Sequence, residues 1–143
     1  MVPLIQGGNR LEIDHIFICS KYKGPEGDML VDFGLVEGSS NTHPGQGTAN
    51  RRFFFHNVML ELLWIEDLTE AQSPLTKTMR LYERCIEATE KVCPFGIDFR
   101  PTKEQQEAAP FTAWDYQSDR LVRSVVWIIK KSRESPCANL QWF

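Results

Sequence analysis

The stretch RRFFFHNVMLELLWI, residues 51–65, contains two apolar runs separated only by His56 and Asn57. Runs rich in Phe, Val, Leu and Ile favour β-strands, and a gap of two polar residues predicts a tight hairpin in which Asn57 adopts a positive φ. With that turn, Phe54 faces Met59 and Arg52 faces Glu61 across the two strands. The hairpin therefore carries one carboxylate, Glu61, among aliphatic neighbours.

A carboxylate buried in such surroundings costs several kcal/mol unless it is paired, hydrogen-bonded or bound to a metal. The sequence offers Glu61 two partners. One is a metal ion shared with His15, and the other is a bidentate ion pair with Arg52 across the hairpin. In a third arrangement Arg52 binds the carboxylate or phosphate of a ligand, while Glu61 acts as a general base with His15 nearby.

The segments on either side of this hairpin extend the pattern. Residues 11–19 (LEIDHIFIC) predict a buried strand in which His15 shares one face with Ile13 and Phe17. Residues 25–33 predict a short helix that ends at Gly34 and packs Leu30 and Phe33 on the sheet. Residues 38–50 are too rich in Gly, Ser and Asn for a regular element and predict a loop, either a rigid turn or a cover over a pocket.

The second half of the chain begins with a predicted helix and continues as strands. Ser73 is a suitable N-cap, and apolar residues at helical spacing predict an amphipathic helix over residues 73–91. Strands are expected at residues 95–100, 124–129 and 140–143, with a stretch around residues 114–116 between them. This order predicts an α+β fold, with two copies of one β-α-β-β unit as a possible basis.

Composition limits the classes of function. A chain of 143 residues with a formal net charge of -3 fits one domain and gives no electrostatic reason to expect nucleic acid. The loop at His43 lacks P-loop spacing, so no nucleotide cofactor is expected. No apolar run reaches the ~20 residues of a membrane span, and residues 1–10 do not form a signal peptide, so a cytoplasmic protein is expected. The four scattered cysteines are interpreted as buried or idle thiols rather than as disulfides or metal ligands.

Several motifs resemble one family. IDHIFI (13–18), FGLVEG (33–38) and MLELLW (59–64) resemble the βαβββ module of the vicinal oxygen chelate superfamily, the glyoxalase-like proteins. NTHPGQGTANRRFFF (41–55), FGIDFRP (95–101) and W-x-Y (114–116) are similar to a subgroup described only as glyoxalase-like domain proteins. The resemblance implies paired βαβββ modules that form a curved mixed-sheet cup, often completed by a homodimer. It divides the chain into an extension (1–10), a first module (11–67), a linker helix (73–91) and a degenerate second module (95–143).

The resemblance also implies site residues. In metal-dependent members a histidine of the first strand and a glutamate of the last strand bind a divalent ion such as Zn, Ni, Mn or Fe, and here those positions are His15 and Glu61. The second module has Gly96 or Ile97, and Gln141, at the matching positions. Two protein ligands are fewer than the three or four that hold a catalytic metal firmly. The residues expected to line the cup and contact a ligand are Phe17, His43, Arg52, Phe54, Met59 and Trp114.

These features predict a protein that binds a small organic molecule in a β-sheet cup. With metal, His15 and Glu61 would serve a lyase, isomerase or dioxygenase whose ion polarises vicinal oxygens of the substrate. Without metal, the same cup would belong to a non-catalytic binding protein of the drug-sequestering kind. A dimeric interaction module with a vestigial pocket is also compatible with the sequence, since fold alone does not determine function.

Overall fold

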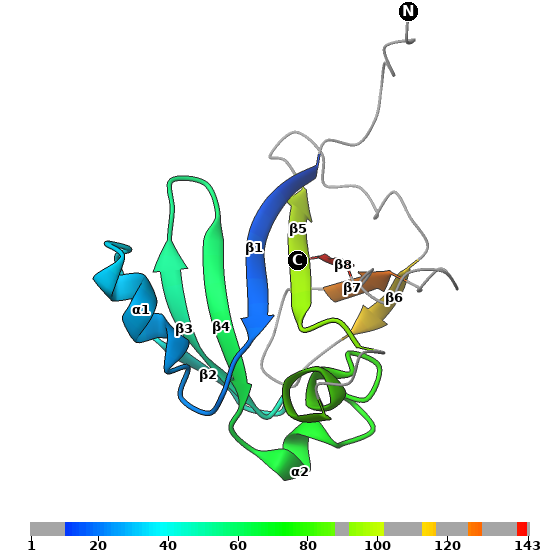
Figure 1. Cartoon of the computed structure of the whole chain (residues 1–143). Coiled ribbons are helices and arrows are strands. Elements are labelled where there is room, and N and C mark those ends of the chain that lie inside the picture. Colours follow the sequence, from blue (N-terminus) through cyan, green and yellow to red (C-terminus); the bar gives the residue numbers. More distant parts are fainter. Residues whose placement is uncertain (1–10, 88–91, 102–112, 117–125, 130–139, 143) are drawn as a thin grey trace, which may run out of the picture.

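The computed structural model describes residues 11–87, 92–101, 113–116, 126–129 and 140–142. Over these ranges the chain is α+β, as predicted, with one open mixed sheet and few helices (Figure 1). The strands are β1 (Leu11–Cys19), β2 (Asn41–His43), β3 (Thr48–Phe54), β4 (Met59–Ile65), β5 (Phe95–Pro101), β6 (Ala113–Tyr116), β7 (Val126–Ile129) and β8 (Leu140–Trp142). The helices are α1 (Glu26–Asp32), α2 (Leu68–Ala71) and the π-helix η1 (Glu83–Glu87).

The sheet consists of two halves with the same strand pairing. Its order is β2-β3-β4-β1 followed by β5-β8-β7-β6. In each half the first strand pairs in parallel with the last, and the remaining pairs are antiparallel. The two halves join through an antiparallel pairing of β1 with β5. The β-rich segments expected in the second half of the chain are therefore present, and they repeat the connectivity of the first half.

The β3–β4 hairpin has the predicted register. Arg52 pairs with Glu61 and Phe54 pairs with Met59. The turn is closed by a hydrogen bond that the Phe55 amide donates to the Val58 carbonyl, at 2.9 Å. The predicted positive φ at Asn57 is wrong, because Asn57 is not among the described residues with positive φ. Since this one bond already closes the turn, the chain reverses without a left-handed residue.

The segment 38–50 is more regular than predicted. Asn41–His43 forms β2, which pairs with the beginning of β3. Only the residues between them form a turn, in which Gly45 and Gly47 have φ values of 85° and 73°. A Cβ on Gly47 would lie 2.4 Å from the Asp67 carbonyl oxygen, so the chain needs glycine there for close backbone approach. The glycines thus allow a hairpin turn and do not exclude strands on either side of it.

The predicted helix over residues 73–91 is wrong for most of the described part. Residues 74–80 form successive turns, and helical structure begins only at residue 81 and continues into η1, while residues 88–91 lie outside the described ranges. Arg80 has a φ of 55°, which an α-helix cannot contain. Of the apolar residues at helical spacing, Met79 is buried and Tyr82 packs against the core, whereas Leu75 and Ile86 are exposed, so the spacing predicted burial only in part.

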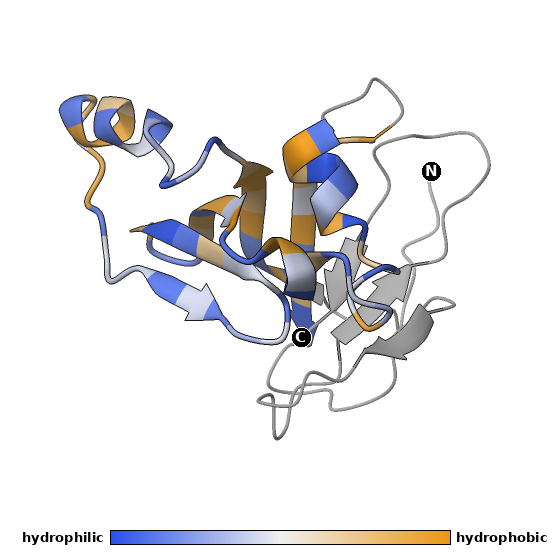
Figure 2. Ribbon diagram, turned by 90° about the horizontal axis from the view of Figure 1, so that it is seen from below, coloured by the Kyte–Doolittle hydropathy of each residue, from blue (hydrophilic) through white to orange (hydrophobic). Residues whose placement is uncertain are grey.

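The main core lies under one face of β1 and β4. Phe17, Leu63 and Ile65 from the strands pack against Ala71, Met79 and Leu81 from the segment that contains α2 and the approach to η1. Figure 2 shows hydrophobic residues concentrated in the central strands of the described part. The upper part of the same face, towards the hairpin turn, carries His15 and Glu61, because both residues alternate in phase with the core residues.

A disulfide joins Cys19 to Cys85 at the edge of this core. The interpretation of all four cysteines as buried or idle thiols is therefore wrong for this pair, whereas Cys93 is a free, buried thiol. The bond connects the end of β1 to η1 across a sequence separation of 66 residues. The helical segment has to fold back on the sheet before the two thiols meet, which no spacing in the sequence indicates.

Helix α1 covers the opposite face of the sheet, beside β3 (Figure 1). It has the predicted position and is followed by Gly34 with a φ of 104°. Its contact with the sheet is polar, because the Arg51 guanidinium donates to the Gly24 carbonyl and to Asp28. The prediction that Phe33 packs on the sheet is wrong, since Phe33 is 86% exposed.

Candidate functional site

His15 is the centre of a buried polar cluster on the core face of the sheet. Its Nε2 lies 2.5 Å from Asp98 Oδ2 and 3.4 Å from Glu61 Oε2. Its Nδ1 lies 2.8 Å from Asp14 Oδ2. His15, Glu61 and Asp98 are all buried. One imidazole therefore contacts three carboxylates, and those of Glu61 and Asp98 are buried.

Glu61 is held by polar residues of β2 and β3 as well as by His15. The Asn50 side-chain amide donates to Glu61 Oε1, and Asn50 Oδ1 accepts the Asn41 amide at 2.8 Å. His43 Nε2 lies 3.9 Å from Glu61 Oε1, while His43 Nδ1 shares a hydrogen bond with Thr48 Oγ1 at 2.9 Å. The β2–β3 hairpin at the sheet edge thus places the Asn50 amide and the His43 imidazole next to the Glu61 carboxylate.

Asp98 enters the cluster from β5, the strand that joins the two halves of the sheet. Sequence reasoning expected Gly96 or Ile97 at the corresponding position, and that expectation is wrong. The β1–β5 register shifts between Ile13 and His15, after which His15 faces Asp98. A β-bulge of this kind inserts one unpaired residue, here Asp14, and cannot be located from strand periodicity. A signal was nevertheless present, because Asp98 is a lone carboxylate within the apolar run FGIDF, as Glu61 is within MLELL.

Gly96 has a separate role beneath the cluster. It pairs with Phe17, and a Cβ at position 96 would lie 1.9 Å from the Phe17 ring. The Phe17 ring therefore occupies the space that a side chain on Gly96 would need. Phe17, predicted as a ligand contact, is instead 3% exposed and forms the floor of the site.

The protonation states follow from this burial and these contacts. Burial alone lowers the pKa of His15, but hydrogen bonds to Asp14 and Asp98 and the charges of Asp98 and Glu61 raise it to about 10. Burial raises the pKa of Glu61 in spite of the His15 charge and the Asn50 hydrogen bond. Burial likewise raises the pKa of Asp98. Burial therefore disfavours the charged form of both carboxyl groups, while the charge of His15 favours it.

His43 has the opposite character. Burial, followed by the charges of His15 and Arg52, lowers its pKa to about 4. His43 is therefore neutral at neutral pH and retains a lone pair on one ring nitrogen. The two oxygens of Glu61 thus lie near different imidazoles, that of His15 with a raised pKa and that of His43 with a lowered pKa.

Arg52 does not pair with Glu61, although the two residues face each other across the hairpin. Its Nε donates to the Ser39 carbonyl at 2.7 Å and its Nη2 donates to Ser39 Oγ at 2.8 Å. Its guanidinium lies 5.5 Å from the centre of the Phe54 ring. The predicted ion pair is therefore wrong, because Asn50 and His15 occupy the positions around Glu61 and Ser39 draws the guanidinium aside.

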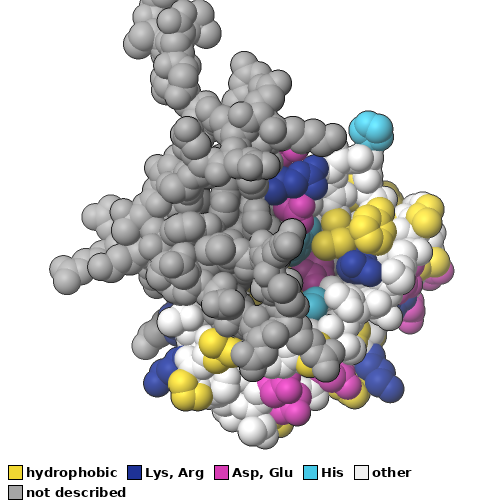
Figure 3. Space-filling model, turned by 180° about the vertical axis from the view of Figure 1, so that it is seen from behind, with side chains coloured by type: hydrophobic (Ala, Val, Ile, Leu, Met, Phe, Trp, Pro, Cys, Tyr) yellow, Lys and Arg dark blue, Asp and Glu magenta, His cyan; other side chains and the backbone are white. Residues whose placement is uncertain are grey.

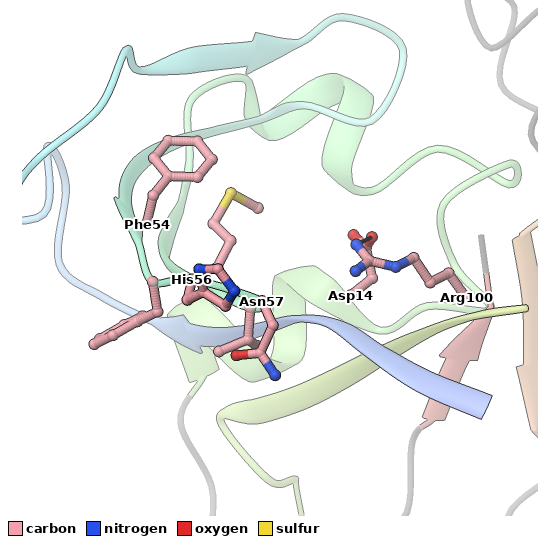
Figure 4. Close-up of a pocket in the computed structure, with 8 residues that line it drawn as sticks. Asp14, Phe54, His56, Asn57 and Arg100 are labelled. Carbon is pink, nitrogen blue, oxygen red and sulfur yellow. Dashed lines mark hydrogen bonds and ion pairs between the residues drawn. The ribbon is translucent and has the colours of Figure 1, made fainter. Parts of the chain in front are cut away.

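A hollow lies at the turn end of the sheet, next to the cluster, and Asp14 borders it. A cavity of about 250 Å³ is lined by residues of the hairpin, including Phe54 and Met59, and by Asp14 and Arg100 on the opposite side (Figure 4). Met59 pairs with His15 in register, so it connects the hollow to the cluster. Figure 3 shows histidine and acidic side chains gathered beside exposed hydrophobic ones on this side of the molecule.

Two expected positions lie in the second half of the sheet. Trp114 is in β6, and Gln141 is in β8 opposite Asp98. The structure describes the backbone of these strands, and the side chain of Trp114 lies outside what it describes. Of the predicted site residues, His15, Glu61 and His43 therefore come together, Met59 and Phe54 line the adjacent hollow, and Arg52 lies beside it.

The residues present fit a divalent ion in part. Ligand atoms bound at about 2.1 Å to one ion are separated by roughly 3.0–3.4 Å. His15 Nε2 and Glu61 Oε2, at 3.4 Å, meet this condition, whereas His15 Nε2 and Asp98 Oδ2, at 2.5 Å, are too close. In the described residues no three His, Cys, Asp or Glu side chains are already grouped to hold a metal. A metal would thus have to displace the direct contact between His15 and Asp98.

Comparison with known proteins adds no family assignment. No family model matches the chain, and no characterised protein matches its sequence. Within the described ranges no helix is both long enough and apolar enough to span a membrane.

Proposed function

We propose that the protein binds a small organic molecule in a glyoxalase-like cup whose polar centre is His15, Glu61 and Asp98. The observation that carries this proposal is the convergence of two buried carboxylates on one imidazole, next to a hollow lined by Phe54 and Met59. A cluster of this kind is costly to bury, and perturbed carboxylates in a concave site are typical of functional sites. The identical strand pairing of the two halves of the sheet supports the paired-module arrangement.

We further propose that a divalent ion is the natural partner of this cluster. Burial raises the pKa values of Glu61 and Asp98, and a bound cation would favour the ionised form of both groups. His15, Glu61 and Asp98 would provide the three protein ligands of a catalytic centre, one more than the sequence suggested. When bound, the ion would polarise adjacent oxygens of the ligand, as lyase, isomerase or dioxygenase chemistry requires.

The other residues would bind the ligand and move protons. Phe54 and Met59 would form an apolar wall against a bound ligand, and Arg52 would provide a positive charge beside Phe54. His43, which is neutral and lies 3.9 Å from Glu61 Oε1, could accept a proton from a group bound against Glu61. A homodimer that completes the cup belongs to the same proposal.

The second candidate is a binding protein that uses the cup without metal. The direct contact between His15 and Asp98 favours this candidate, because a protonated imidazole already compensates part of the buried negative charge. In that case the cluster would be a rigid hydrogen-bonding surface for the ligand. No turnover would be expected.

Metal analysis of protein purified without added ions separates the two candidates. Stoichiometric Zn, Ni, Mn or Fe that is lost in His15→Ala, Glu61→Ala and Asp98→Asn would support the metal centre. His56→Ala is the matched control, because His56 is exposed at the hairpin turn. A folded wild type that stays metal-free and gains no thermal stability from any of these ions would reject the metal and leave the binding protein.

A further inference from the structure

Asp14 contacts the ring of its own sequence neighbour, which is unusual in a β-strand. Successive side chains normally point to opposite faces of a sheet, so residues 14 and 15 should diverge. Here Asp14 Oδ2 lies 2.8 Å from His15 Nδ1. The contact is possible because the register between β1 and β5 shifts at this point, and a bulge redirects the side chain of the unpaired residue.

A residue of β5 holds Asp14 from the other side. Arg100 Nη1 donates to Asp14 Oδ1 at 2.9 Å, and Arg100 Nε donates to Glu12 Oε2 at 3.3 Å. Figure 4 shows Asp14 and Arg100 meeting at the edge of the hollow, across from Phe54. Each carboxylate oxygen of Asp14 thus has its own partner, and the side chain is fixed in direction.

The geometry points to Asp14 as a positioning residue for His15. We propose that the Arg100–Asp14 pair fixes the ring orientation of His15 and keeps a proton on Nδ1, so that Nε2 is directed at Glu61 and Asp98. A carboxylate behind a metal-binding histidine commonly sets its tautomer in this way, and removal of such a partner typically reduces metal affinity by about 10–100-fold. The inference deepens the proposed function, and the part that concerns metal affinity rests on it.

The orientation of His15 does not depend on a metal, and it has a direct spectroscopic readout. In ¹⁵N-edited NMR spectra of the wild type, the proton on His15 Nδ1 should give a downfield, slowly exchanging resonance, because it is hydrogen-bonded to Asp14. Asp14→Ala should abolish that resonance. Asp14→Asn keeps an oxygen that can accept the hydrogen bond and should retain part of the signal. Asp28→Asn is the control, because Asp28 is an exposed carboxylate that pairs with an arginine, Arg51, on the other face of the sheet.

Metal affinity is the second readout, measured by calorimetric titration with Zn²⁺ and Mn²⁺. Asp14→Ala should weaken binding about 10–100-fold, and Asp14→Asn should weaken it less. Arg100→Met tests the same pair from the exposed side if Asp14→Ala does not fold, and it should broaden the Nδ1 resonance. An unchanged resonance in both Asp14→Ala and Arg100→Met overturns the inference, as does unchanged affinity in a wild type that binds metal. If the wild type binds no metal, the metal proposal fails, and the resonance alone decides the role of Asp14.

Discussion

Replacing Gly96 by alanine tests the contact that sets the depth of the site. Gly96 on β5 faces Phe17 on β1, and the added Cβ would lie 1.9, 2.2 and 2.7 Å from three atoms of the Phe17 ring. Carbon atoms normally pack at about 3.5–4.0 Å, so the ring would have to move by well over 1 Å. Phe17 is 3% exposed and lies in the core cluster with Leu63 and Met79, which leaves it nowhere to turn.

We expect Gly96→Ala to lower the free energy of unfolding by about 3 kcal/mol, the upper end of the range for overpacked cores. Urea denaturation with an unchanged m-value is the assay. The double variant Phe17→Leu/Gly96→Ala should lose less than the sum of the two single variants, because leucine leaves room for the new methyl group. Gly38→Ala is the matched control. Its Cβ would also meet a phenylalanine ring, at 2.3 Å, but that ring belongs to Phe54, which is 51% exposed and can rotate away.

A loss below 0.5 kcal/mol in Gly96→Ala, on the order of the effect expected for an exposed position, would refute the reasoning. It would mean that Phe17 does not lie over Gly96. The β1–β5 register that places Asp98 opposite His15 would then also be wrong, because both pairs belong to it. Restored stability in the double variant would argue the opposite, since coupling of that kind requires direct contact.

Three further predictions concern the frame of the site. Replacing Cys19 and Cys85 by serine should cost about 4 kcal/mol on the loop-entropy relation for a separation of 66 residues, and equal melting temperatures with and without reductant would contradict this. The pKa of His43 is lowered to about 4 from 6.5, so its contribution to stability is complete above pH 6.5 and is lost as pH falls towards 4. Between pH 7 and pH 5 the wild type should therefore lose about 1–2 kcal/mol more than His43→Gln in urea denaturation, and equal losses would refute the shift. Arg84→Met should lower the free energy of unfolding by about 3 kcal/mol in thermal unfolding, because the buried Arg84 guanidinium donates hydrogen bonds to the Cys93 and Phe95 carbonyls. An unchanged melting temperature would show that water replaces those bonds.

The hairpin was predictable because its signal is local. Two polar residues between two apolar runs leave few possible turns, and the side-chain period of two then assigns Phe54, Met59 and Glu61 to one face. The same period placed His15 on the core face of β1. No long-range information is needed for either step, and both elements have the predicted register and phase.

The predictions for the cysteines and for the helix over residues 73–91 were wrong because these features depend on long-range contacts. Cys19 and Cys85 meet only after the segment before η1 folds back on the sheet. The pattern over residues 74–80 predicted one buried helical face, but Met79 is buried while Leu75 is exposed, and a left-handed Arg80 interrupts the segment. In both cases tertiary contacts decided between local alternatives that the sequence leaves nearly equal in energy.

Asp98 shows why the site was only half predictable. Strand periodicity assigns faces correctly only while the register is regular, and a single bulge moves every later residue by one position relative to its partner. If the pairing of Ile13 with Phe99 continued without a bulge, His15 would face Ile97 instead of Asp98, and only the two residues that the sequence indicates, His15 and Glu61, would meet. The same irregularity therefore adds Asp98 as the third residue of the centre and turns Asp14 towards the imidazole. Deletion of residue 14 would leave Ile13 opposite Phe99 and His15 opposite Asp98 in continuous register, so it should abolish the Nδ1 resonance while His15 and Asp98 stay together. A deletion in the exposed turn at His56 should spare the resonance.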